Sequence, residues 1–193
     1  FVVSVLTFVG FVPHVSANPT AIMVQVDINH RADFWGVPMD CNWGTPAWHI
    51  RAAIAHLLDK EDFVSTNVIG ATVIDNPVPM TAALTSWYLN WNPLLLGFAD
   101  PLHPAVSLYN TVPGIPDYHE AVEHLLQAGA GWTDNNLDDV IDNPPLTKIK
   151  FYTALEWGTT RTLLAQTLES AIERVFGADV VELISAHWVD IFW

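Results

Sequence analysis

The sequence predicts an α/β fold. The strongest evidence is in its last third, where a strand, a long helix and a second strand follow one another with short connections between residues 146 and 184. An alternating strand pattern at residues 21–29 and two helices with clear N-terminal caps support the same class. Two strands joined by a helix predict a parallel pair with a right-handed crossover.

The first 20 residues form a separate segment. Phe1–Pro13 (FVVSVLTFVGFVP) is apolar but too short to span a bilayer. It is either a buried strand of a longer protein or the tail of a signal peptide, with Val15-Ser16-Ala17 as a small-residue cleavage site. Because no basic region precedes it, the strand is the preferred interpretation.

A strand and two helices follow. Ile22, Val24, Val26 and Ile28 share one face of a predicted strand. A loop rich in Trp, Pro and Gly (RADFWGVPMDCNWGTP) then leads to a helix with Thr45 as N-cap and Pro46 at the first position. Asp59 caps a second, short helix, which Gly70 is expected to end.

Residues 71–116 show little periodicity and contain seven prolines, so we expect an irregular path held to a larger body by aromatic side chains. A helix then opens at Asp117 and closes at Gly129. The strand at 146–154, the helix from Thr159 or Thr160 to Gly177, and the strand at 180–184 complete the chain. The apolar stripe predicted for the last helix is Leu163, Leu164, Leu168, Ile172, Val175 and Phe176.

Charge and composition exclude some functions. The chain of 193 residues carries 21 acidic and 7 basic residues, a formal net charge of −14. Such a chain repels phosphate backbones, which argues against nucleic-acid binding. Its single cysteine, Cys41, excludes an internal disulfide and is expected to be a small buried thiol.

The sequence gives no positive support for catalysis. His49 and His56 are seven residues apart, and His119 and His124 are five apart, so neither pair has the i, i+4 spacing of a helical metal site. Solvated or capping histidines are the better interpretation. A Gly-rich phosphate loop, a nucleophile elbow and a Cys/His pair are all missing from the sequence.

One acidic loop has the pattern of a calcium site. Asp134, Asn136, Asp138 and Asp142 stand at positions 1, 3, 5 and 9 of an EF-hand-like loop. Asp139 replaces the glycine at position 6 and Pro145 the glutamate at position 12. The alternative is a series of Asx-turns on a solvated loop.

Three tryptophans lie where a ligand could reach them. Trp35 and Trp43 are in a loop directly after a strand, and Trp157 is in the strand-to-helix connection near the end of the chain. Ligands of open α/β sheets bind beyond the carboxyl ends of strands. Glu156, Trp157 and the following helix N-terminus would form one lip of a binding site there.

The order of these motifs resembles that of family 5 extracellular solute-binding proteins of ABC transporters, the type that binds peptides, nickel or oligosaccharides. The run WHIRAAIAHLLDKEDFVSTNVIGATVIDNPVP (48–79) is similar to the family's Arg-x-Ala-Ile/Leu helix, its Asp-Lys/Arg-Glu turn and its proline-flanked loop. HEAVEHLLQAGAGWTDNNLDD (119–139) resembles its next helix and acidic loop. The resemblance covers roughly residues 21–184.

The resemblance implies a type II periplasmic-binding-protein-like lobe over residues 21–193, one of two lobes that close around a ligand. It places both Asn29, near the hinge, and the Glu156–Trp157 lip in regions that face the cleft and contact the ligand. The expected function is capture of an oligopeptide or oligosaccharide outside the cytoplasm and its delivery to an ABC permease, without chemistry. A membrane is reached through that permease or through an anchor elsewhere in the protein.

Two other functions stay open at this point. One is a secreted, calcium-stabilised enzyme or adhesion domain. The other is a structural lobe with an interaction role.

Overall fold

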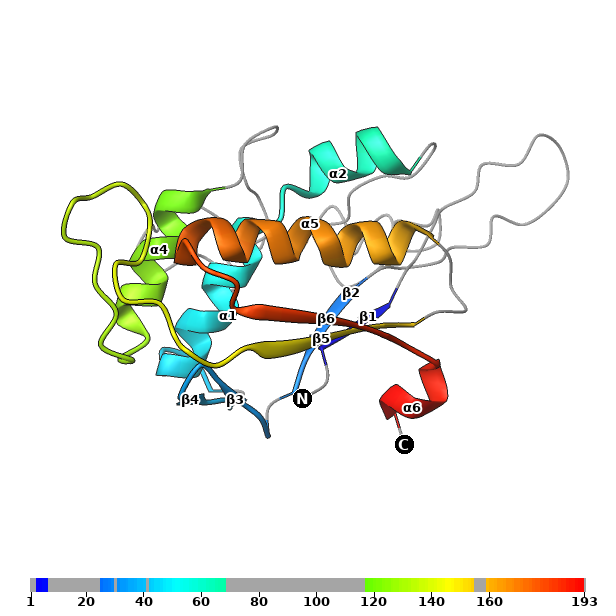
Figure 1. Cartoon of the computed structure of the whole chain (residues 1–193), viewed down its shortest axis with the longest axis horizontal. Coiled ribbons are helices and arrows are strands. Elements are labelled where there is room, and N and C mark those ends of the chain that lie inside the picture. The colour runs from blue at the N-terminus through cyan, green and yellow to red at the C-terminus, as the bar shows by residue number, and fades with distance from the viewer. Residues whose placement is uncertain are drawn as a thin grey trace, which may run out of the picture.

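The computed structural model describes residues 3–6, 25–29, 31–40, 42–68, 117–154 and 159–192 (Figure 1). The predicted irregular segment at 71–116 lies outside these residues, as do Cys41, Gly70, Glu156 and Trp157. The described part combines helices with a four-stranded sheet and a small hairpin, so the predicted α/β class is confirmed.

The main sheet is mixed. Its strands are β1 (Val3–Leu6), β2 (Gln25–Ile28), β5 (Ile149–Ala154) and β6 (Val181–Ala186), in the order β2-β1-β5-β6. β1, β5 and β6 run parallel, whereas β2 is antiparallel to β1. We call the edge where the three parallel strands end the carboxyl rim, and the opposite edge, where β2 ends, the amino rim.

The predicted strand–helix–strand unit is confirmed. α5 (Thr159–Phe176) connects β5 to β6 and lies along the sheet (Figure 1). Leu164, Leu168 and Ile172 are buried at four-residue intervals. Leu163 is 40% exposed, which corrects the predicted stripe, because it lies about 100° around the helix from Leu164.

α5 ends at a glycine, as predicted. Gly177 has φ +58°, and a Cβ there would lie 2.9 Å from a methyl carbon of Val140. Both the backbone conformation and the space therefore favour glycine at this position.

Two helices pack against each other beside α5. α1 (Pro46–Leu57) begins at Thr45, whose side chain accepts a hydrogen bond from the Trp48 amide at 3.2 Å, as the sequence predicts. α4 (Tyr118–Gln127) begins after Asp117, at the predicted position. The Asp117 side chain makes no cap hydrogen bond. The backbone amide of Asp117 donates to the backbone carbonyl of His56 at 3.1 Å.

α2 (Lys60–Asn67) lies on the outer side of α5 (Figure 1). Asp59 caps it by accepting from the Asp62 amide at 2.8 Å, which confirms the predicted N-cap. The chain ends with a short helix, α6 (Trp188–Phe192). Of the helices that the structure describes, none has both the length and the apolar character needed to cross a membrane.

A hairpin replaces part of the predicted loop after β2. β3 (Asp33–Phe34) pairs with β4 (Val37–Pro38), and Trp35 and Gly36 form the two-residue turn between them. Both turn residues have positive φ, +53° and +90°, as a type I′ turn requires. The loop prediction failed because such turns usually carry Asn-Gly or Asp-Gly, whereas Trp in this conformation is uncommon.

Candidate functional site

The predicted ligand lip follows β5 in the sequence, and β5 ends at the carboxyl rim. β5 ends at Ala154 and α5 begins at Thr159, and Glu156 and Trp157 are in the sequence between them. Both residues lie outside the described part of the chain. Ligand contact by Glu156 and Trp157 therefore stays a prediction.

Two buried polar residues flank that connection, and sequence reasoning missed both. The Thr153 hydroxyl, on the second-last residue of β5, is buried and has no hydrogen-bond partner among the described residues. Arg161, in the first turn of α5, is also buried, and its burial lowers the pKa of the guanidinium. Buried polar groups beside a connection at the end of a parallel strand are typical of binding sites. The sequence gave little indication of the role of Thr153, because this residue occupies the same alternating face of β5 as the apolar Ile149 and Phe151.

Asn29 lies at the other end of the sheet. It follows β2, which is antiparallel to its neighbour and therefore ends at the amino rim. Its side-chain oxygen accepts from the Arg31 amide at 2.9 Å, and its carbonyl accepts from the Ala32 amide at 3.1 Å. Asn29 therefore follows a strand that ends at the amino rim, whereas β5, which precedes Glu156 and Trp157 in the sequence, ends at the carboxyl rim. Ligand contact by Asn29 stays a prediction.

Trp35 is a core residue. Its side chain is 6% exposed, and its indole N–H donates to the carbonyl of Val180, the residue before β6, at 3.1 Å. It packs edge-on against Trp132 and, tilted, against Phe176. These contacts hold its positive-φ backbone. Its burial and its contact with Val180 place Trp35 at the amino rim, away from the carboxyl ends of the parallel strands. Ligand contact by Trp35 stays a prediction.

Trp43 remains accessible. Its side chain is 53% exposed and lies against the buried Trp48, with ring centroids 4.7 Å apart. Trp43 follows the hairpin, whose Trp35 contacts Val180 at the amino rim, so it lies on the amino-rim side of the described structure. Ligand contact by Trp43 stays a prediction.

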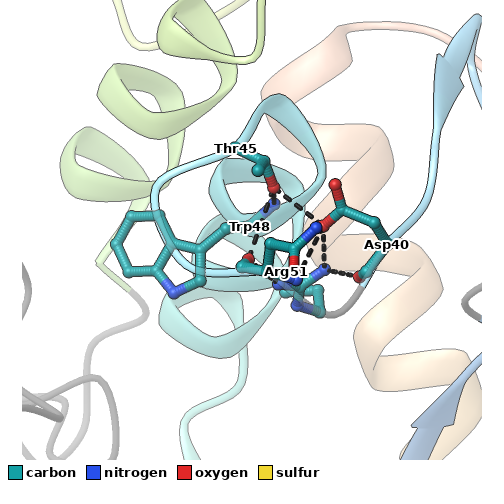
Figure 2. Close-up of polar contacts among 5 residues, drawn as sticks. Asp40, Thr45, Trp48 and Arg51 are labelled. Carbon is teal, nitrogen blue, oxygen red and sulfur yellow. Dashed lines mark hydrogen bonds and ion pairs between the residues drawn. The ribbon is translucent and has the colours of Figure 1, made fainter.

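Hydrogen bonds fix the loop that carries Trp43 (Figure 2). Asp40 accepts from the Thr45 hydroxyl at 2.8 Å and from the Asn42 amide at 2.9 Å. Arg51 donates to the backbone carbonyls of Asp40 and Asn42, and its guanidinium lies 3.8 Å from the Asp40 carboxylate. Desolvation raises the pKa of Asp40, but the hydrogen bonds and the Arg51 charge outweigh it, so the pKa is lowered. This network positions α1.

The acidic loop is also at the amino rim, where the Ile141 amide donates to the carbonyl of Val175 near the end of α5. The carboxylate of Asp134 accepts from the Asp138 and Asp139 amides at 3.3 and 3.1 Å. Asp142 accepts from the Asn135 amide at 2.6 Å.

Asp138 in turn accepts from the Val140 amide at 3.1 Å. Backbone amides therefore donate to the carboxylates of Asp134, Asp138 and Asp142, as expected for the alternative, a series of Asx-turns. Asn136 donates to the Asp138 carboxylate at 3.0 Å. Within the described residues, no group of three or more His, Cys, Asp or Glu side chains is placed to hold a metal ion. A calcium ion bound by Asp134, Asn136, Asp138 and Asp142 stays a prediction.

Three histidines meet between α1 and α4. The Nδ1 atoms of His49 and His124 lie 2.9 Å apart, and the His56 ring stacks on His124 with centroids 5.5 Å apart. His56 and His124 are fully buried, which corrects the expectation of solvated or capping histidines. The missed signal is the seven-residue spacing of His49 and His56, which places both on one face of a helix.

The contact between His49 and His124 constrains their protonation. One Nδ1 must carry the hydrogen and the other must accept it, so both rings cannot be protonated at Nδ1 while they touch. On the far side of the stack, the Asp117 carboxylate lies 3.6 Å from His56 Nδ1. Burial, and then the charge of Glu120, raise the pKa of Asp117, although His56 opposes this shift.

A pocket of about 370 Å³ opens between the end of α1, α2, α4 and α5. Its apolar wall is Leu57, Phe63 and Ala171, and its polar lining is Asp59, Asp62, Asn67, Tyr118, Thr167 and Ser170. We call it the Asp59 pocket. The sequence predicted Asp59 as a helix cap but gave no indication of the pocket, which depends on how α2 packs on α5.

Comparison with protein-family models, with curated proteins and with solved structures finds no match for this chain.

Proposed function

We propose that the chain is part of the ligand-binding lobe of an extracytoplasmic solute-binding protein, which captures an oligopeptide or oligosaccharide and delivers it to an ABC permease. The observation that carries the proposal is the parallel β5–α5–β6 unit, because the crevice beyond the carboxyl ends of such strands is where open α/β sheets bind ligands. The order of sequence motifs described above supports the same family.

The chemistry of the carboxyl rim fits such a ligand. Thr153 offers a buried hydroxyl that lacks a partner among the described residues, and Arg161 offers a buried cation close by in sequence. With Glu156 and Trp157 between them, the rim combines hydrogen-bonding groups, both charges and an aromatic face. Aromatic faces stack on sugar rings and on apolar side chains of peptides.

The proposed mechanism is closure rather than catalysis. A ligand shared between this lobe and a second one stabilises the closed state by its extra contacts there. The permease would then recognise the closed form. The type II periplasmic-binding architecture and the location outside the cytoplasm belong to this proposal.

Calorimetric titration of the full-length protein, which contains both proposed lobes, with panels of short peptides and oligosaccharides tests the proposal. We expect one panel to bind, and Trp157→Ala to weaken that binding by more than about tenfold, as for an aromatic side chain central to an interface. Trp43→Ala serves as the matched control, since Trp43 is exposed but lies on the amino-rim side, and it should leave the affinity unchanged.

Two results would contradict the proposal. If neither panel binds, ligand capture of this kind is excluded. If Trp43→Ala abolishes binding while Trp157→Ala does not, the ligand sits on the amino-rim side and the argument from the parallel strands fails.

A further inference from the structure

The helix α2 is too short to be stable without support from the rest of the protein. It has eight residues, Lys60–Asn67, and it is separate from α1 because the backbone is extended at Leu58 and Asp59. Isolated helices of fewer than about 12 residues are marginal in water. Packing against other elements must therefore hold α2 in its helical form.

That packing depends on one side chain. Phe63 is 6% exposed, and it is the only buried residue of α2 among those whose side chains the structure describes. It contacts Leu164 of α5 in a small apolar cluster that is distinct from the main core. The partly buried Leu58, Val64 and Val68 complete this cluster.

The side-chain hydrogen bonds described for α2 are local. The Asp62 amide donates to the Asp59 carboxylate at 2.8 Å. The Ser65 hydroxyl donates to the Asp62 carbonyl at 3.0 Å, and the Asn67 side chain donates to the Phe63 carbonyl at 3.0 Å. These bonds lie within the helix and its N-cap, so separating α2 from α5 does not require a hydrogen bond between the two helices to break.

The arrangement with α2 packed on α5 also carries an electrostatic cost. Asp59 is 7% exposed, and its Oδ2 is buried without a hydrogen-bond partner among the described residues. A buried polar atom left unsatisfied costs free energy, and the cost is larger for a charged group. Water reaches this oxygen once α2 unfolds, and the hydration of Asp59 favours that state.

We propose that α2 is a lid, which opens by local unfolding of residues 60–68 while α1, α4, α5 and the sheet stay folded. Opening gives up the contact between Phe63 and Leu164, whereas global unfolding exposes the whole main core. Because α2 lies on the outer side of α5 (Figure 1), opening uncovers Leu164 and the α5 wall of the Asp59 pocket. The lid does not depend on the function proposed above.

Native-state hydrogen exchange, followed by NMR on the full chain, tests the inference. We expect the opening constant of the amides of residues 63–68 to be at least about tenfold larger than that of residues 168–175 in α5. Low concentrations of urea should change the opening constant of α2 only slightly, because local opening exposes little surface. The opening constant of α5 should rise steeply with urea.

Two variants separate local from global opening. Phe63→Ala should raise the opening constant of the α2 amides at least about tenfold, because the contact with Leu164 is lost. The matched control is Ile172→Val, which shortens a buried side chain of the main core. It should raise the opening constant of the α5 amides about two- to tenfold and leave that of α2 unchanged, since the main core is intact whether the lid is closed or open. Circular dichroism establishes that both variants are folded.

Four outcomes would overturn the inference. The first is equal opening constants for α2 and α5, and the second is an absence of protection in α2, which would mean that the closed lid is not populated. The third is an equal rise in both helices in Ile172→Val. The fourth is an unchanged α2 opening constant in a folded Phe63→Ala variant. None of them bears on the peptide and sugar titrations, whose variants lie in other parts of the chain.

Discussion

The buried Thr153 hydroxyl is a polar atom without a partner in the described structure, on a strand next to the proposed ligand site. Replacing it with the isosteric valine removes the unsatisfied oxygen and retains the packing. We predict that Thr153→Val raises the free energy of unfolding by about 1 kcal/mol, measured by urea denaturation. If the hydroxyl binds ligand, the same variant also loses affinity.

A second threonine provides the control. The Thr45 hydroxyl both donates to Asp40 and accepts from the Trp48 amide (Figure 2). Thr45→Val should therefore lower the free energy of unfolding by about 1 kcal/mol. Destabilisation by both variants would show that the Thr153 hydroxyl has a stabilising partner.

His119 is an exposed residue whose charge is stabilised by its neighbours. Its hydrogen bond with Asp139, at 2.8 Å, raises the pKa of His119, although desolvation opposes this. A raised pKa in the folded state gives stability that is present below the unfolded value of 6.5 and lost as pH rises through the folded value. We predict that an NMR titration places the His119 pKa above 6.5 and that Asp139→Asn lowers it. An identical pKa in the variant would contradict this assignment.

At the scale of elements, the contact between α1 and α4 should be sensitive to acid. His124 touches both His49 and His56, so adding protons puts like charges into a buried cluster. We predict that the free energy of unfolding is lower at about pH 5 than at about pH 7 because of this repulsion, measured by urea denaturation. Trp48 emission should report the change, because its ring contacts both His49 and His124.

A variant separates this cluster from other sources of acid sensitivity. His124→Gln should show a smaller fall in stability over the same pH range than the wild type. His187→Gln, which changes an exposed histidine before α6, should show the wild-type fall. Equal pH dependence in His124→Gln and the wild type would place the acid sensitivity elsewhere.

The elements that sequence predicted best are those with local signals. The caps at Thr45 and Asp59 and the stop at Gly177 each depend on a few neighbouring residues, and the structure has them where they were expected. The β5–α5–β6 unit was predictable because its connections are short and its direction follows from chain geometry.

What could not be predicted depends on contacts between distant segments. Nothing in the residues of β2 indicates that it runs antiparallel to β1, so the sequence does not reveal that its carboxyl end lies at the amino rim. The burial of Trp35 depends on Val180 and Phe176, which lie far along the chain. The histidine cluster and the Asp59 pocket likewise arise from helix packing, which residue spacing within one helix does not reveal.

At the scale of the whole molecule, the charge of −14 is the main electrostatic feature. Self-repulsion among 21 acidic residues opposes the compact state, and salt screens it. We predict that raising NaCl from about 20 mM to about 500 mM increases the melting temperature, measured by differential scanning calorimetry.

The same measurement distinguishes screening from a calcium site. The melting temperature should be compared in NaCl, CaCl₂ and MgCl₂ at the same ionic strength. A chelator added to the CaCl₂ sample should then reverse any effect that is due to bound calcium. An additional rise with calcium alone, lost in Asp134→Asn, would support the predicted loop site. Equal melting temperatures in all three salts would contradict it.

The strand directions also have a practical consequence for building a sensor from this protein. Leu146 is fully exposed and stands just before β5, so it lies beyond the amino rim. The six residues of β5 separate it from the proposed ligand site by about 20 Å. A cysteine introduced there could tether the protein to a chip or carry a dye while the opposite end of the sheet stays accessible to solutes.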